Sequence, residues 1–168
     1  MKIQIVNDGD KLVGLKERSE IDYQNDIYRV AALWLRNSND EVLIAQRKLS
    51  KDKDPGKWGP AVAGTLEEGE TYESNIAKEA DEEIGLVGVT FEKGPKERVT
   101  SPRNFFTQWF TASVDKDLNE FTTQEAVVEK IAWVPESELI KDVKENPDKY
   151  IPTMPGIIEL FYGDSYPK

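Results

Sequence analysis

Eight carboxylates crowd the middle of the chain between Gly64 and Leu86, where Lys78 is the only cation. On a helix, like charges three or four residues apart cost roughly 0.2–0.5 kcal/mol per pair, and acidic groups in the last turn also face the unfavourable end of the helix dipole. A divalent cation would reverse this cost, because Mg²⁺ and Mn²⁺ prefer oxygen ligands. The spacing therefore indicates a metal site, with three carboxylates on one helix face as the candidate ligands: Glu79, Glu82 and Glu83.

One helix must position these carboxylates. Thr71 can cap its first turn, Gly85 can end it in the left-handed conformation, and neither proline nor glycine lies between them. Ile76, Ala80 and Ile84 recur every four residues and form an apolar stripe beside the acidic face. From the helix alone, an ordinary solvated face remains the alternative to a metal site.

The composition excludes several other chemistries. The 168 residues include neither cysteine nor histidine, so thiol and imidazole catalysis are closed and any metal must be held by oxygen. A net charge of −10 argues against a nucleic acid polymer or an anionic membrane as partner. Asp8 and Asp10 interrupt the amino terminus where a signal peptide would stay apolar, so we expect a cytoplasmic protein.

The length suits a single domain over residues 1–168, in which strands surround the acidic helix. An N-terminal hairpin is expected over residues 1–27, around the turn NDGD. Proline and glycine predict a loop over 48–60, just before the acidic segment. The pattern predicts further strands at 28–36, 41–47, 88–93, 104–114 and 127–134, and short helices at 135–147 and 155–163.

The acidic segment also resembles the Nudix box over residues 64–86. The positions in register are Gly64, Glu70, Glu79, Glu82, Glu83, Gly85 and Leu86. The resemblance implies a Nudix α/β/α sandwich with a mixed β-sheet and a loop-helix-loop catalytic box. It also implies that Glu79, Glu82, Glu83 and the carbonyl of Gly64 hold the Mg²⁺ or Mn²⁺ ions that bridge a diphosphate.

Two positions depart from the box pattern. Lys78 stands where the family has an arginine that pairs with the glutamate represented by Glu70, and Ala80 fills an aliphatic position with a small side chain. Lysine offers one mobile charge instead of a planar fork, so we expect a looser structural pairing with Glu70. A non-catalytic diphosphate-binding module is therefore the alternative to an enzyme.

Beyond the box, the layout is similar to the isopentenyl diphosphate isomerase branch of the family. That isomerase needs a cysteine and histidines, but Ala63, Thr65 and Tyr28 stand at those positions. Alanine cannot donate a proton, so isomerisation is the less favoured prediction.

Hydrolysis of a diphosphate linkage in a nucleoside-diphosphate-type small molecule is the leading prediction, because metal ions supply most of the required chemistry. The general base is expected among Glu83, Glu82, Glu125 and Glu129, although Glu129 reads equally as a surface strand residue. Arg47 and Lys57, before or within the loop that precedes the box, are candidate phosphate-binding residues or ordinary surface cations, and the same two readings apply to Lys48, Lys51 and Lys53. The sequence does not choose between a nucleotide, a dinucleotide and a prenyl diphosphate, and it leaves a homodimer open.

Overall fold

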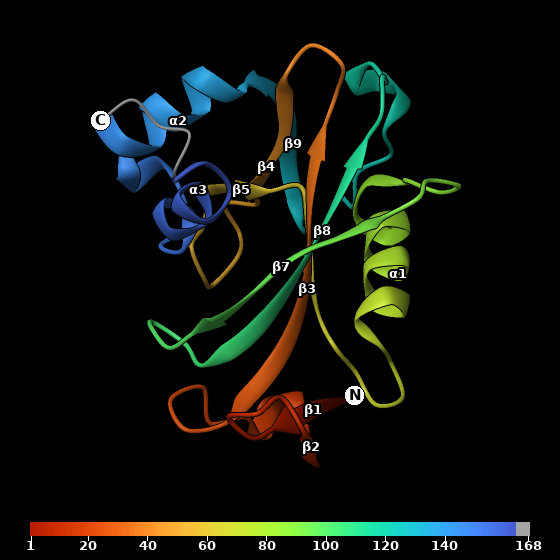
Figure 1. Ribbon diagram of the computed structural model, residues 1–168, viewed down its shortest axis with the longest axis vertical. Helices are drawn as coiled ribbons and strands as arrows, with labels where there is room; N and C mark the ends of the chain where they lie inside the picture. Colours follow the sequence, from red (N-terminus) through yellow and green to blue (C-terminus); the bar gives the residue numbers. More distant parts are fainter. Residues whose placement is uncertain (164–168) are drawn as a thin grey trace.

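One mixed sheet forms the centre of the protein (Figure 1), and the computed structural model describes residues 1–163. Nine strands belong to this sheet within the described residues. Their bounds are β1 Lys2–Val6, β2 Leu12–Glu17, β3 Ile27–Arg36, β4 Glu41–Arg47, β5 Trp58–Pro60, β6 Val62–Thr65, β7 Glu92–Val99, β8 Phe105–Ser113 and β9 Val128–Pro135.

Strand β3 organises the sheet because its long apolar run pairs on both edges. It pairs antiparallel with β1, β4 and β6, and parallel with β8 from Tyr28 opposite Phe105 to Arg36 opposite Ser113. The sheet is therefore mixed, as predicted. Strand β6 places Gly64 opposite Ala31, so the start of the acidic segment lies against the buried centre of the sheet.

Helix α1, Tyr72–Ile84, has the bounds that its caps predict. The Thr71 side chain accepts from the Ser74 backbone N–H at 3.0 Å, and Gly85 ends the helix with a φ of 67°. The predicted apolar stripe is buried against the sheet, together with Leu33 and Phe110.

Helices cover both faces of the sheet (Figure 1). Helix α1 packs on one face, while α2, Glu136–Glu145, and α3, Met154–Tyr162, share a second core with Trp34 and Trp109 on the other. This arrangement confirms the α/β/α sandwich. Throughout residues 1–163, each helix falls short of the length and apolar character that crossing a membrane requires.

Two predicted boundaries differ from the structure. The predicted loop 48–60 ends in β5, where Gly59 pairs with Ala45 of β4, because backbone hydrogen bonding needs no apolar alternation. The predicted strand 88–93 starts later, at Glu92, and extends to Val99, with an irregular register around Gly94 and Pro95. Pairing with β8 thus overrides the breaking signal of that glycine–proline step.

Candidate active site

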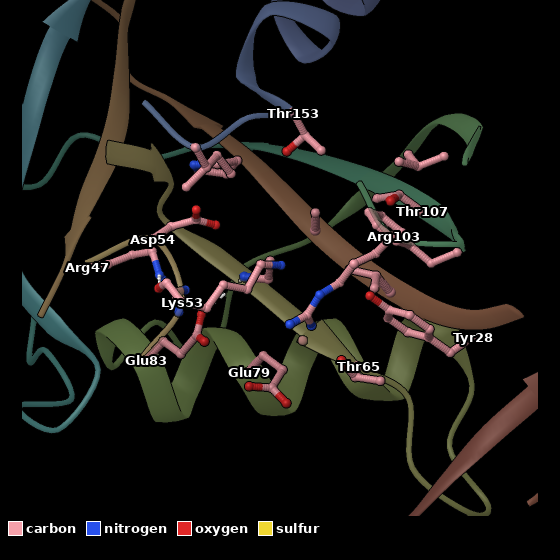
Figure 2. Close-up of a pocket in the computed structure, with 18 of the residues that line it drawn as sticks. Tyr28, Arg47, Lys53, Asp54, Thr65, Glu79, Glu83, Arg103, Thr107 and Thr153 are labelled. Carbon is pink, nitrogen blue, oxygen red and sulfur yellow. Dashed lines mark hydrogen bonds between the residues drawn. The ribbon is translucent and has the colours of Figure 1, made fainter. Parts of the chain in front are cut away.

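An open cleft of about 620 Å³ lies above helix α1 (Figure 2). Glu83 points into it from the helix (Figure 2), and Glu79, Glu82 and Glu67 also line it. We call Glu79, Glu82 and Glu83 the carboxylate platform. The structure thus brings the three predicted metal ligands, together with Gly64, to one side of one cleft.

Gly64 is the position that lets Glu79 lie against β6. A Cβ atom added at Gly64 would lie 2.3–2.5 Å from three atoms of the Glu79 side chain, so any larger residue would push that side chain away. Burial raises the pKa of Glu79, and Lys78 opposes the rise while the charge of Glu82 adds to it. The carboxylate is therefore held close to backbone and to like charge at the same time.

Glu83 is anchored at the other end of the platform. The backbone N–H of Ala63 donates to Glu83 Oε2 at 3.1 Å. Burial, followed by the charge of Glu79, raises the pKa of Glu83 to about 8. Glu82 stays exposed at the rim of the cleft. The platform therefore holds like charges that the protein itself leaves largely uncompensated.

This donor set fits a hard divalent cation, because every side chain in it offers oxygen and the crowded charges would be neutralised by an ion. In the part of the chain that the structure describes, no three acidic side chains converge as a ready-made metal cage.

Lys78 makes the structural pairing predicted for it. Its Nζ lies 2.5 Å from Glu70 Oε1, and also 3.5 Å from Glu67 and 3.7 Å from Glu79. Glu70 further accepts from the Glu67 backbone N–H at 2.9 Å and from Asn75 Nδ2 at 2.8 Å. These donors lower the pKa of Glu70 although burial opposes them. The loop before α1 is therefore fixed even without the arginine fork.

Two of the predicted phosphate-binding cations, Arg47 and Lys57, lie in different places. Arg47 lines the cleft, where its Nε donates to the Lys53 carbonyl at 2.9 Å and its charge acts on Glu83. Lys57 does not line the cleft, since its Nζ donates to the Asp148 carbonyl. Lys57 lies in the same loop as the cleft-lining Lys53 and Asp54, and nothing in the sequence indicated its contact with Asp148.

The two candidate bases outside the helix do not reach the cleft either. Glu125 is exposed in a turn, and Glu129 pairs with Lys48 at 3.3 Å on the surface of β9. Their neighbours Gln124 and Val127 line the cleft instead. Of the four candidates, only Glu82 and Glu83 face the cleft.

The positions that carry the isomerase residues also line the cleft. They are Ala63, Thr65 and Tyr28, and burial raises the pKa of the Tyr28 phenol. None of the three is an acid in the neutral range. The cleft thus keeps the isomerase layout without its proton donors.

Sequence reasoning missed two features of the cleft. Arg103 reaches into it from the loop between β7 and β8 (Figure 2), and only its position beside the aromatic run of β8 could have drawn attention to it. The second feature is an apolar wall. Its residues are Val30, Val99, Phe105, Trp109, Ile151 and Ile157.

Comparisons with known proteins agree with this geometry. A family model for the NUDIX domain matches residues 27–154. The chain is 30% identical over 171 residues to the prenyl-diphosphate phosphatase of Methanosarcina mazei, covering 95% of this chain and 94% of that protein. It is also 30% identical over 131 residues to the isopentenyl-diphosphate Delta-isomerase of Corynebacterium diphtheriae, covering 72% and 70%.

The fold has a close counterpart among solved structures. The crystal structure of DR0079 from Deinococcus radiodurans aligns with a TM-score of 0.83 at 20% identity, over 94% of this chain and 97% of that one. The family model spans most of the chain, and the Methanosarcina mazei relative matches it almost from end to end. The chain therefore belongs to the Nudix hydrolase family and is a pyrophosphohydrolase.

Proposed function

We propose that the protein hydrolyses the diphosphate linkage of a prenyl diphosphate, in a reaction that depends on Mg²⁺ or Mn²⁺. The observation that carries the proposal is the joining of the carboxylate platform and the apolar wall in one cleft. The platform suits metal-bound phosphates, while six apolar side chains suit a hydrocarbon tail that offers no hydrogen bonds. The name of the Methanosarcina mazei relative supports the same substrate class.

The chain supplies the positioning groups for this reaction. Glu79, Glu82, Glu83 and the Gly64 carbonyl would hold the metal, which when bound would neutralise the phosphates and lower the pKa of a water molecule. Attack of water oxygen on phosphorus breaks the bond to the bridging oxygen, giving a prenyl monophosphate and inorganic phosphate. The proton of the water passes to Glu82 or Glu83, because Glu125 and Glu129 lie outside the cleft.

A nucleoside-diphosphate-type compound, the class that the sequence favours, is the second candidate. Thr107 and Glu97 line the cleft near the apolar wall, and Glu97 Oε1 accepts from Trp109 Nε1 at 3.1 Å. Such groups could accept or donate hydrogen bonds to sugar hydroxyls. A sugar would leave the apolar wall without a matching partner, which is why prenyl diphosphates come first.

Phosphate release from a panel of compounds tests the proposal. The panel should contain dimethylallyl, geranyl and farnesyl diphosphates, ADP-ribose and a dinucleoside polyphosphate, each with Mg²⁺, with Mn²⁺ and with a chelator. We expect kcat/KM to be at least about tenfold higher for a prenyl diphosphate than for either nucleoside compound, and turnover to stop with the chelator. Equal or higher kcat/KM for a nucleoside compound would contradict the prenyl assignment.

The Glu83→Gln variant checks the assigned chemistry on the best substrate of that panel. Glutamine keeps the shape but cannot bear the negative charge or take the proton, so turnover should fall by about 10²-fold or more. Glu129→Gln is the matched control, because Glu129 lies on the surface of β9, and its turnover should equal that of the parent.

A further inference from the structure

Two cations reach into the cleft from loops that lie far apart in the sequence. Lys53 belongs to the loop between β4 and β5, and Arg103 to the loop between β7 and β8. Figure 2 shows them above helix α1, entering from opposite sides of the cleft. We call Lys53 and Arg103 the cationic pair.

The cationic pair carries two like charges without an acidic partner. Among the ion pairs of residues 1–163, none involves Lys53 or Arg103. The two charges are close enough that Arg103 lowers the pKa of Lys53, after a larger lowering by burial, while Asp54 opposes it. A site that holds two cations together stabilises an anion placed between them.

Aromatic side chains fix the position of Arg103. Its guanidinium carbon lies 3.9 Å from the centre of the Tyr23 ring, within the range of a cation–π contact. Tyr23 packs edge-on against Tyr28 at 5.6 Å, and Tyr28 packs against Phe105 at 5.3 Å. The Tyr23 ring engages the face of the guanidinium, and Arg103 also lies close enough to the Tyr28 hydroxyl to oppose the rise in the Tyr28 pKa. Among residues 1–163 no carboxylate forms an ion pair with Arg103, so N–H groups of the planar fork remain available to an anion.

The loop that carries Lys53 is held as well. The Arg47 side chain donates to the backbone carbonyl of Lys53 at 2.9 Å and, with that bond, ties the loop to the end of β4. Lys53 itself lines the cleft with its side chain exposed to solvent. Arg103 and the backbone that carries Lys53 are therefore positioned before any ligand binds, which reduces the entropy lost on binding.

We propose that the cationic pair is a diphosphate clamp, in which Arg103 binds phosphate oxygens through two N–H groups and Lys53 binds as a point charge. The clamp takes the face of the diphosphate that points away from the carboxylate platform, so that metal and cations hold the phosphates from two sides. This inference rests on the proposed function in one respect, that the substrate carries a diphosphate. It does not depend on whether the attached group is prenyl or nucleoside.

Calorimetric binding of methylenediphosphonate in the presence of Mg²⁺ tests the clamp directly, since this diphosphate mimic is not hydrolysed and carries no tail. Arg103→Gln should weaken its binding by about 10- to 100-fold, and Lys53→Gln by about tenfold, since charge-assisted bonds are lost. Arg103→Lys keeps the charge but loses the fork, so its affinity should lie between those of the parent and Arg103→Gln.

Arg98→Gln is the matched control. Arg98 also stacks on an aromatic ring, 5.1 Å from the centre of Phe106, but it does not line the cleft. Its affinity for the mimic should equal that of the parent. A purely structural role for Arg103 would instead lower the melting temperature while leaving the affinity of the folded protein unchanged.

Kinetics on the best substrate of the panel give a second readout. The clamp acts on the phosphates in the bound substrate, so Arg103→Gln should raise KM by about tenfold or more for any diphosphate that the parent hydrolyses. An Arg103→Gln protein that binds the mimic as tightly as the parent would overturn the clamp. So would a parent that does not bind the mimic at all. A nucleoside preference in the panel would overturn the prenyl assignment and leave the clamp intact.

Discussion

At the scale of the residue, the active site depends on the glycine at position 64, which has no side chain. Gly64 leaves room for the Glu79 carboxylate to lie against β6, and Gly64 itself lines the cleft. The Glu79 carboxylate can therefore lie close to the backbone of β6 only because Gly64 carries a hydrogen atom where alanine would carry a methyl group. A glycine in a strand usually weakens it, so this one is explained by the neighbouring carboxylate.

Gly64→Ala should abolish most of the activity. The added Cβ would lie within 2.5 Å of Glu79, which must then swing out of the platform, and turnover should fall by about 10²-fold or more. Steady-state hydrolysis measures this loss. Gly156→Ala in α3 is the control, because its Cβ would meet no atom within 4 Å and alanine favours a helix. Parental activity in Gly64→Ala would contradict the role assigned to Gly64.

At the scale of the element, the sequence predicted those features that depend on residues close together in the chain. Helix α1 was predicted with its observed ends, because Thr71 and Gly85 mark them and act within one turn. Arg103 could not be recognised, because its meeting with Lys53 depends on two loops coming together in space. Lys57 and Lys53 are lysines of the same loop, yet Lys57 donates to the Asp148 carbonyl while Lys53 lines the cleft. Loop cations thus need the fold before they can be assigned.

The turn between β1 and β2 also makes contacts with elements that lie far from it in the sequence. The Asp10 carboxylate accepts from Arg29 Nε of β3 at 2.6 Å, from the Tyr72 hydroxyl of α1 at 3.0 Å and from Lys96 of β7. Burial alone would raise the pKa of Asp10, but Lys96, Arg29 and Tyr72 outweigh it and hold the pKa below its ordinary value of 3.8. One carboxylate therefore connects the hairpin to three other elements.

Asp10→Asn should lower the free energy of unfolding by about 2–4 kcal/mol at neutral pH, because two cations then lose a largely buried partner. Asparagine tolerates the positive φ of 56° at this position, so the turn itself is retained. A lowered folded pKa stabilises the protein above the unfolded pKa, and this contribution is lost as the pH falls. The difference between parent and variant should thus be full at pH 6 and shrink below about pH 3.8.

Urea unfolding at a series of pH values measures that difference. Asp8→Asn serves as the control, because Asp8 is 92% exposed and pairs with Arg98 only at 3.5 Å. Its effect should stay below about 1 kcal/mol at every pH. If the difference in the free energy of unfolding between the parent and Asp10→Asn is the same at pH 3 and pH 6, the carboxylate charge is not the cause of the stabilisation.

At the scale of the whole molecule, the carboxylate platform connects function to stability. Burial and like charge raise the pKa of Glu79 and of Glu83, so in the absence of metal these charges oppose folding. A ligand that binds the native state stabilises it by mass action. Metal binding should therefore appear as a change in the unfolding of the entire protein, although the contacts involve a few side chains.

Millimolar Mg²⁺ or Mn²⁺ should raise the melting temperature of the parent, by about 2–4 °C for each kcal/mol gained in a protein of this size. Glu83→Gln should melt higher than the parent in a chelator, because one crowded charge is gone, and should respond less to metal. Differential scanning calorimetry checks both effects, with sodium chloride at matched ionic strength as the control for screening. A melting temperature indifferent to both ions would argue against the metal site.

The carboxylate platform and the cationic pair come from different segments of the chain. Helix α1 and its caps, which hold the carboxylates, are encoded within one short stretch of chain. The opposite wall draws on the loop between β7 and β8, which contributes Arg103 but no member of the carboxylate platform. Changes in that loop can therefore alter how tightly the diphosphate is held, while the helix that carries the carboxylates is left unchanged.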